Sequence, residues 1–245
     1  EISEIEHPTV RESLKYLKIK DGIELVHSAD VPARSGLGSS SSFTVGLLHA
    51  LHFLKKQLPG KRQLAHEAID IEQNYVNEFV GSQDQVATAF GGLNKIDFNK
   101  KDNFTVNPLP IDEMSKKKLE ESILIFFTGF SRNASAVAEK QMSRITKNIN
   151  ELNIMNSFVD KAADYIRNSN ISDFGMLMNE NWERKKRLSP YISNHNIDLL
   201  YNLGIKNGAY GGKLLGAGSG GFMLFITPKK NRKKIIAELK NYVHV

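Results

Sequence analysis

A stretch rich in glycine and serine that runs directly into a helical pattern is the feature that constrains this chain most. Gly36-Leu37-Gly38 is followed by four serines, Ser39 to Ser42, and apolar residues then recur at helical spacing from Phe43 to Leu58. The first N–H groups of a helix have no partner within the helix, and the helix dipole adds partial positive charge there. The stretch therefore predicts a backbone cradle for a phosphate group. The alternative is a serine N-cap with a flexible turn.

A second glycine-rich stretch, Gly216 to Gly221, matches the string G-x-G-x-x-G. In a dinucleotide-binding fold this string opens a helix, whereas here the apolar, strand-like run Phe222 to Ile226 follows it. The order strand, glycine turn, strand is therefore predicted. So many glycines predict that a ligand or another part of the chain approaches this backbone closely, and the alternative is a hairpin that binds nothing. The first stretch also lacks the Gly-Lys-Ser/Thr of a Walker loop, so it predicts another way of binding phosphate.

The rest of the chain alternates between helical and strand-like patterns, with a boundary near residues 112–118. Strands are expected at residues 23–26, 93–98, 104–109, 122–128, 213–217 and 221–227. Helices are expected at residues 43–58, 62–77, 83–90, 134–150, 153–168, 172–188 and 194–207, and a last helix ends near residue 242.

Composition excludes several classes of protein. Among 245 residues, 40% are hydrophobic and 24% are charged, which argues against a disordered chain or a coiled coil. The absence of cysteine excludes disulfides, thiolate metal sites and a cysteine nucleophile, and we expect the reducing cytoplasm as the location. No apolar run approaches the ~20 residues that a membrane-spanning helix needs, so we expect no membrane partner.

The formal charge of +6, from 33 basic and 27 acidic residues, does not by itself indicate nucleic-acid binding. The runs at residues 116–118 and 229–234 are expected to be solvated helix faces and ends. A modest positive excess also suits an enzyme with phosphorylated substrates. We therefore expect small-molecule partners and no nucleic acid.

The two glycine motifs together resemble those of the GHMP kinases, which include galactokinase, homoserine kinase and mevalonate kinase. The resemblance implies that ATP is the phosphate donor and that both motifs take part in binding it. In this chain the corresponding residues are Pro32, Gly36, Leu37, Gly38, Ser39, Ser40 and Ser41 in the first motif, and Gly216, Ala217, Gly218, Ser219 and Gly220 in the second.

The resemblance also implies an α+β fold, that of the GHMP kinases. We expect an ATP-binding N-terminal domain related to ribosomal-protein-like folds at residues 1–115, and a ferredoxin-like C-terminal domain at residues 116–245. The glycine-rich N-terminal motif of the family has no counterpart in the sequence, which begins at Glu1. We therefore expect that the N-terminal domain lacks its first strands here.

Two carboxylates match functional positions of the family. Asp84 lies in Gly81-Ser82-Gln83-Asp84-Gln85, where sugar kinases of the family carry a Gly-x-x-Asp-Gln signature, and we expect it to take the proton of the acceptor hydroxyl. The resemblance implies that Glu72 and Ser40 hold Mg²⁺, which prefers oxygen ligands. Alternatively, Glu72 is a solvated helix residue and Asp84 belongs to a turn or cap.

Within the family, several short motifs resemble those of the D-glycero-D-manno-heptose 7-phosphate kinases, which act on the anomeric hydroxyl in the synthesis of bacterial surface-polysaccharide precursors. An acceptor that already bears a phosphate needs cationic partners, and the candidates are Arg132, Lys185, Lys186 and Arg187. The last three could equally be a charged helix end, and Trp182 is expected in the core. The alternatives are a kinase similar to fucokinase or galactokinase, and a regulatory protein that binds nucleotide without catalysis. We expect a monomer or a homodimer.

Overall fold

The computed structural model describes residues 1–20, 22–31, 35–99, 103–129 and 144–245. The chain divides into two compact units. The N-terminal unit comprises Glu1–Arg34 and Gly38–Val106, and the C-terminal unit comprises Ser35–Leu37 and Asn107–Val245. The three residues Ser35–Leu37, from the first glycine stretch, thus belong structurally with the second half of the chain.

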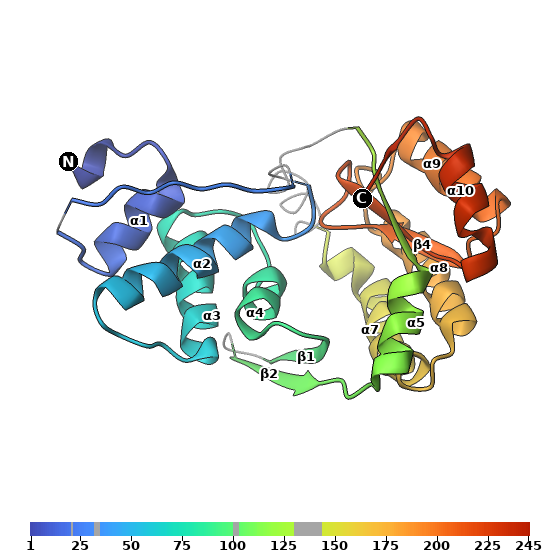
Figure 1. Ribbon diagram of the computed structural model, residues 1–245, viewed down its shortest axis with the longest axis horizontal. Coiled ribbons are helices and arrows are strands. Elements are labelled where there is room, and N and C mark those ends of the chain that lie inside the picture. Colours follow the sequence, from blue (N-terminus) through green and yellow to red (C-terminus); the bar gives the residue numbers. More distant parts are fainter. Residues whose placement is uncertain (21, 32–34, 100–102, 130–143) are drawn as a thin grey trace. The chain divides into compact units, whose positions relative to one another are not determined.

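The N-terminal unit is mainly helical, with a two-stranded sheet formed by β1 and β2 (Figure 1). Its hydrophobic core joins α1, α2 and α3, and Leu48, Leu51 and Ile71 are at most 1% exposed. The elements in chain order are η1 (Ile2–Glu4), α1 (Pro8–Tyr16), α2 (Ser39–Leu54), α3 (Lys61–Asp70), η2 (Ile71–Tyr75), α4 (Gln83–Phe90), β1 (Asn94–Asn99) and β2 (Asn103–Pro108).

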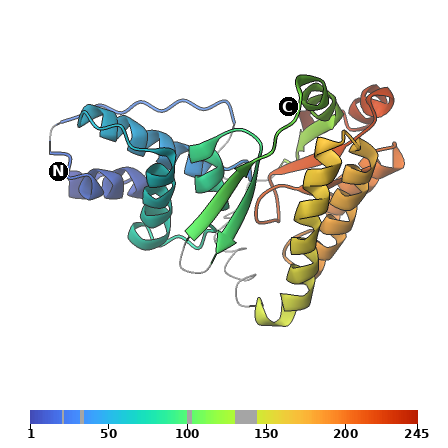
Figure 2. The ribbon, with the colours of Figure 1, turned by 90° about the horizontal axis from the view of Figure 1, so that it is seen from below.

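The C-terminal unit is built on a four-stranded antiparallel sheet with the strand order β4-β5-β3-β6. Its chain order of strand, helices, two strands, helix and strand is that of a ferredoxin-like fold. Figure 2 shows α7 and α8 side by side. The elements are α5 (Glu113–Ser122), β3 (Ile123–Phe127), η3 (Thr146–Asn148), α7 (Ile149–Arg167), α8 (Ile171–Leu188), α9 (His195–Lys206), β4 (Gly211–Leu214), β5 (Phe222–Ile226), η4 (Lys229–Asn231), α10 (Arg232–Glu238) and β6 (Val243–His244).

Strand alternation gives this sheet one apolar, fully buried face. Phe126, Leu214, Met223 and Phe225 point to that face, and each is completely buried. They belong to a single core cluster that also contains Trp182, so the expected core position of the only tryptophan is confirmed. The expected α+β fold class is likewise confirmed.

Most of the expected elements are present, with shifted ends. The strand expected at residues 23–26 is wrong: no strand is assigned between residues 22 and 31, because a strand requires a hydrogen-bonded neighbour and none is present there. The helix expected at residues 43–58 is α2, which begins earlier, at Ser39. The helices α1 and α5 were not expected, and residues 134–143 of another expected helix lie outside the described residues.

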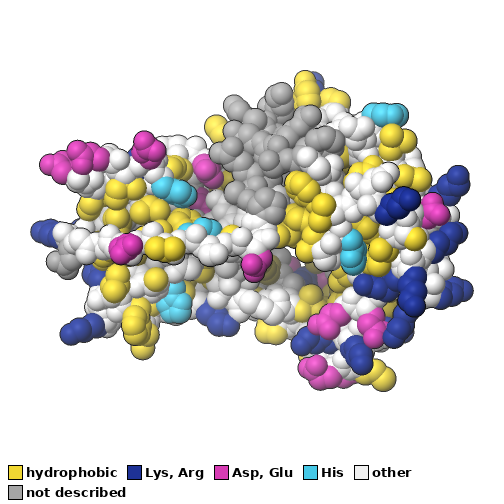
Figure 3. All heavy atoms as spheres, turned by 45° about the horizontal axis from the view of Figure 1, so that its top comes forward, with side chains coloured by type: hydrophobic (Ala, Val, Ile, Leu, Met, Phe, Trp, Pro, Cys, Tyr) yellow, Lys and Arg dark blue, Asp and Glu magenta, His cyan; other side chains and the backbone are white. Residues whose placement is uncertain are grey.

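Exposed basic side chains gather on the C-terminal unit in the face drawn in Figure 3. Lys116, Lys117 and Lys118 are exposed on α5, as are Lys229 and Lys230 on η4, which confirms their expected positions on solvated helix faces and ends. No helix among the described residues is long and apolar enough to cross a membrane.

Candidate active site

The helix that follows the first glycine stretch begins without a side-chain cap. Gly38 is the N-cap residue of α2, has a left-handed backbone with φ of 72°, and is followed directly by Ser39 in the first turn. Gly38 has no side chain that could accept a hydrogen bond from the first N–H groups of α2. The end of the helix therefore offers backbone donors and partial positive charge, the arrangement that binds a phosphate.

Asp84 lies against this helix start. It occupies the first turn of α4, and a methyl group placed on Gly38 would lie 3.5 Å from the Cβ and Cγ atoms of Asp84. Burial raises the pKa of Asp84 above its ordinary value. A carboxylate with a raised pKa beside an anion-binding helix end has the character of a group that accepts a proton during phosphoryl transfer.

A second carboxylate, Glu72, is buried behind α2. It lies in the π-helical turn η2, a rare conformation that is frequent at functional sites, and is 2% exposed. Its Oε2 atom accepts hydrogen bonds from the Ser41 hydroxyl at 3.1 Å and from the Gln85 amide at 2.5 Å. Burial raises the pKa of Glu72, and hydrogen bonds from Thr44, Gln85 and Ser41 partly oppose this shift.

Two oxygen atoms in this cluster are suited to a cation. Glu72 Oε1 and Gln85 Oε1 are both buried, and neither has a hydrogen-bond partner among the described residues. Unsatisfied carboxylate and amide oxygens are hard ligands of the kind that Mg²⁺ takes, so these residues fit the expected ion. Within the described part of the chain, no group of three or more His, Asp or Glu side chains is placed to bind a metal.

The serine that contacts Glu72 is Ser41, the neighbour of the expected metal ligand Ser40. Ser41 is buried and faces Glu72, whereas Ser40 is exposed on the first turn of α2. The side chains of consecutive helix residues differ in direction by about 100°, so the two hydroxyls lie in different environments. The pairing of Ser40 with Glu72 around a metal stays a prediction.

The second glycine motif forms the expected turn between two antiparallel strands, β4 and β5. Part of the first glycine stretch lies directly against this turn, within the C-terminal unit. A Cβ atom on Gly216 would lie 2.8 Å from Gly36 Cα, and one on Gly221 would lie 2.2 Å from Ser35 O. The amide of Phe222 donates to Ser35 O at 3.2 Å. The glycines therefore permit the close approach of another part of the chain.

Ser219 occupies a backbone conformation that usually favours glycine, with φ of 68°. Its amide donates to Ile192 O at 2.8 Å, and its hydroxyl donates to Tyr191 O. These two bonds tie the glycine turn to the segment that follows α8. Side chains with local hydrogen bonds tolerate the left-handed region better than apolar ones, so serine is accommodated here.

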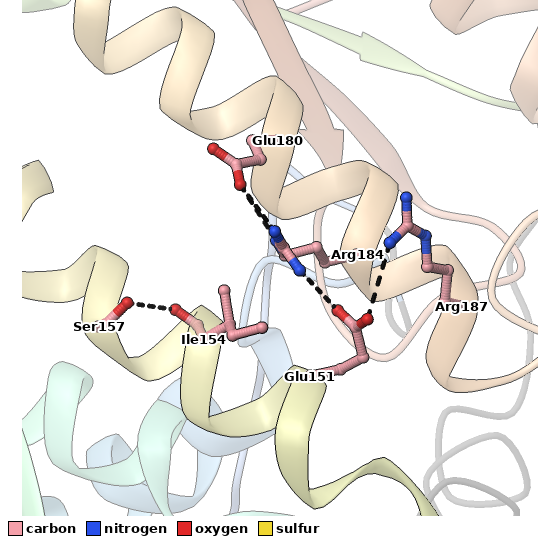
Figure 4. A network of polar contacts seen from close by, with 6 residues as sticks. All are labelled: Glu151, Ile154, Ser157, Glu180, Arg184 and Arg187. Atoms are coloured by element: carbon pink, nitrogen blue, oxygen red, sulfur yellow. Dashed lines mark hydrogen bonds and ion pairs between the residues drawn. The ribbon is translucent and has the colours of Figure 1, made fainter.

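The basic residues at the end of α8 lie in two different environments. Lys185 donates to Gly216 O at 2.5 Å, which places it at the glycine turn. Lys186 pairs with Glu183 at 2.8 Å, and Arg187 lies 3.6 Å from the carboxylate of Glu151 on α7 (Figure 4). Of the three expected phosphate partners that the structure describes, Lys185 therefore faces the glycine turn, whereas Lys186 and Arg187 pair with carboxylates. The other expected site residues Pro32 and Arg132 lie outside the described residues.

Two residues of these clusters were not singled out from the sequence. The amide of Gln85 donates a hydrogen bond to the carboxylate of Glu72, and Lys213 lies on β4 beside the glycine turn. Gln85 lies in the string Gly81–Gln85, and Lys213 lies three residues before the start of the second glycine motif. Their positions follow from packing between segments far apart in the chain, which spacing along the sequence does not reveal.

Two family models match the chain: the N-terminal domain of the GHMP kinases matches residues 8–92, and the C-terminal domain of the GHMP kinases matches residues 162–245. The models leave residues 93–161 unmatched, so the domain boundary at residues 115–116 stays a prediction.

Among curated proteins, the chain is similar to the D-glycero-alpha-D-manno-heptose 7-phosphate kinase of Campylobacter jejuni, with 32% identity over 220 residues, 88% of this chain and 65% of that enzyme. It is also similar to the bifunctional fucokinase/GDP-fucose pyrophosphorylase of Arabidopsis thaliana, with 27% identity over 228 residues, 87% of this chain and 21% of that protein. The chain thus spans less than two thirds of the length of either relative.

Among solved structures, the crystal structure of a D-glycero-D-manno-heptose 1-phosphate kinase from Bacteroides thetaiotaomicron matches with a TM-score of 0.73 and 23% identity. The match covers 97% of this chain and 69% of that one, and it confirms the expected fold. With both family models matched in order along its length, the chain belongs to the GHMP kinase family.

Proposed function

We propose that the protein containing this chain transfers the γ-phosphoryl group of ATP to the anomeric hydroxyl of a sugar phosphate, D-glycero-D-manno-heptose 7-phosphate. The observation that carries the proposal is the 32% identity to a heptose 7-phosphate kinase, combined with the position of Asp84 beside the start of α2. A role in the synthesis of bacterial surface polysaccharides, a cytoplasmic location and the absence of nucleic-acid and membrane partners belong to the same proposal.

In this mechanism the start of α2 binds the phosphates of ATP through backbone N–H groups and serine hydroxyls. The acceptor oxygen forms a bond to the γ-phosphorus, the bond from that phosphorus to the β,γ-bridging oxygen breaks, and ADP leaves with the electron pair. The acceptor proton passes to the carboxylate of Asp84, whose raised pKa makes it a better base than an ordinary aspartate.

The buried oxygen atoms of Glu72 and Gln85 would hold Mg²⁺, and the expected contribution of Ser40 stays part of the proposal, although Ser41 is the serine that contacts Glu72. When bound, the ion neutralises charge on the ATP phosphates. The unsatisfied oxygen atoms of Glu72 and Gln85 support this assignment. Gly216 to Gly220 support the backbone of the first glycine stretch, consistent with the close approach of Gly216 to Gly36.

The test is ADP release by the protein expressed from its complete gene, with ATP, Mg²⁺ and a panel of sugars, hexose 6-phosphates and heptose 7-phosphates. We expect turnover with the heptose phosphate, reduced by about 10²–10⁴-fold in Asp84→Asn with nucleotide affinity retained. Asp164→Asn, an exposed carboxylate on α7, is the matched control and should be fully active.

Each outcome of this panel separates the alternatives. Turnover with fucose or galactose alone would replace the acceptor with that of the fucokinase-like relative or of galactokinase. Nucleotide binding without turnover on any sugar would instead support the regulatory alternative. Near-normal turnover of Asp84→Asn would overturn the role of this residue as the base.

A further inference from the structure

Two lysine side chains of the C-terminal unit lie beside the glycine turn and on the same side of the sheet. Lys185, in the last turn of α8, donates to Gly216 O at 2.5 Å. Gly211, the first residue of β4, faces α8, because a Cβ atom there would lie 2.9 Å from Asn179 Cβ. Successive residues of a strand alternate in direction, so Lys213, two residues later, faces α8 as well.

Both lysine side chains are partly buried. Burial, with a smaller contribution from the nearby charge of Lys213, lowers the pKa of Lys185 to about 7. Burial also lowers the pKa of Lys213. Neither lysine forms an ion pair with any of the described acidic residues, although other basic residues of α8 do.

The described part of the neighbouring elements offers neither lysine an unpaired carboxylate. Strand β5 consists of Phe222–Ile226 and carries no charged side chain. Glu151, on α7, binds Arg184 at 3.0 Å and lies 3.6 Å from Arg187, as Figure 4 shows. Lys186 is paired with Glu183. Lys185 and Lys213 are thus two partly buried lysines with which no described carboxylate forms an ion pair.

Two ammonium groups that lie near each other repel, and a bound anion relieves this repulsion. An ammonium group has three N–H donors, and the bond from Lys185 to Gly216 uses one of its three. Lys213, on β4, adds the donors of a second ammonium group near Lys185. A dianion with several acceptor oxygens satisfies both the charge and the donors, and a phosphate monoester has both properties.

We propose that Lys185 and Lys213 form a phosphate subsite beside the glycine turn, and that it holds the phosphate ester that the acceptor already bears. The identity of the acceptor rests on the proposed kinase function, whereas the affinity of the subsite for phosphate does not. The proposal makes Lys213 a specificity-determining residue, and it assigns the expected substrate contact to Lys185 rather than to Lys186 and Arg187.

Binding of inorganic phosphate, measured by titration calorimetry, tests the subsite directly. Lys185→Met and Lys213→Met keep the apolar stems and remove the charges, and we expect each to weaken phosphate binding at least about tenfold. Lys206→Met, an exposed lysine at the end of α9, is the matched control and should bind like the wild type. Unchanged affinity in both subsite variants, or an equal loss in Lys206→Met, would overturn the subsite.

Proton uptake gives a second readout, which can be measured on the wild-type protein even if a variant does not fold. Near pH 8 the free Lys185 side chain has largely lost its proton, and a bound dianion raises the lysine pKa again. The protein should therefore take up at most about one proton when phosphate binds at that pH. This uptake appears as a dependence of the binding heat on the choice of buffer. The uptake should vanish in both Lys185→Met and Lys185→Arg, because arginine is always protonated, whereas the affinity for phosphate should be restored in Lys185→Arg alone. Binding without uptake at pH 8 would contradict the assignment to Lys185.

Steady-state kinetics identify which phosphate the subsite holds. Both Met variants should raise the KM for the sugar phosphate at least about tenfold, a larger change than the one in the KM for ATP. A raised KM for ATP with an unchanged KM for the sugar phosphate would overturn the assignment to the acceptor. Phosphate binding in a wild-type protein that phosphorylates no sugar would refute the proposed function alone.

Discussion

At the scale of the single residue, the contact between the two glycine stretches leaves no space for a side chain at Gly221. Its φ is +103°, and a Cβ atom there would lie 2.2 Å from Ser35 O. We expect Gly221→Ala to lower the free energy of unfolding by about 3 kcal/mol, through backbone strain and displacement of residue 35.

Urea denaturation measures this loss, and Gly46→Ala is the matched control. Gly46 lies inside α2 with open space around it, so alanine there should raise the free energy of unfolding by about 0.5–1 kcal/mol through helix propensity. Equal effects of the two substitutions would show that the turn does not require glycine.

Glu72 should make the stability of the protein depend on pH in a defined direction. Burial raises its pKa in the folded state, so between the ordinary and the raised pKa the folded protein binds more protons than the unfolded chain. The contribution of Glu72 to stability is therefore greatest at acidic pH and falls as pH rises through that window. Glu72→Gln, which does not titrate, should gain stability relative to the wild type over the same interval.

Urea denaturation at a series of pH values, without divalent cations, measures this difference. Glu24→Gln replaces an exposed carboxylate and should run parallel to the wild type at every pH. A difference between Glu72→Gln and the wild type that stays constant with pH would contradict the raised pKa. Adding Mg²⁺ and nucleotide should stabilise the wild type more than Glu72→Gln, because the variant lacks the carboxylate.

At the scale of the elements, a buried polar pair joins α2 to α3. His52 Nε2 lies 2.7 Å from Glu67 Oε2, and His52 Nδ1 lies 3.0 Å from Gln57 Oε1. Because breaking such a pair leaves a buried polar partner unsatisfied, Glu67→Ala should cost about 3 kcal/mol. Glu24→Ala, at an exposed position, should change stability by less than about 0.5 kcal/mol in the same denaturation experiment. Similar losses in both would refute the role of the pair.

The sequence patterns predict elements better than they predict which elements meet. The turn between β4 and β5 is correctly expected because the glycines and the apolar run that follows lie next to each other in the chain. The prediction of a strand at residues 23–26 is wrong, because an alternation of apolar and polar residues does not reveal whether a neighbouring strand is present. The sequence predicts a start of α2 that is too late, because the spacing of apolar residues gives no information about a first turn made of serines.

The same limit applies to the candidate site. Family motifs single out Asp84 and Glu72, but only the packing of α4 and η2 on α2 brings Asp84 to Gly38 and Gln85 to Glu72. The neighbourhood of Lys185 and Lys213, 28 residues apart in the sequence, follows from the packing of α8 on β4. Residue types and spacing therefore predict the chemistry of the site, and tertiary contacts decide which partners share it.

At the scale of the whole molecule, the described residues form separate hydrophobic cores, and no residue belongs to a core of both units. Trp182, the only tryptophan, is completely buried in the core of the C-terminal unit, so its fluorescence reports the unfolding of that unit. Far-ultraviolet circular dichroism reports both units, because both contain helices. Two probes can therefore follow the units in one sample.

Local substitutions should consequently separate the two probes. Glu67→Ala destabilises the N-terminal unit, so part of the circular dichroism should be lost at lower urea while the midpoint of the Trp182 transition stays in place. Gly221→Ala acts in the C-terminal unit and should move the Trp182 midpoint to lower urea. If both probes shifted together in both variants, the units would unfold as one cooperative body, because each core would then depend on the integrity of the other.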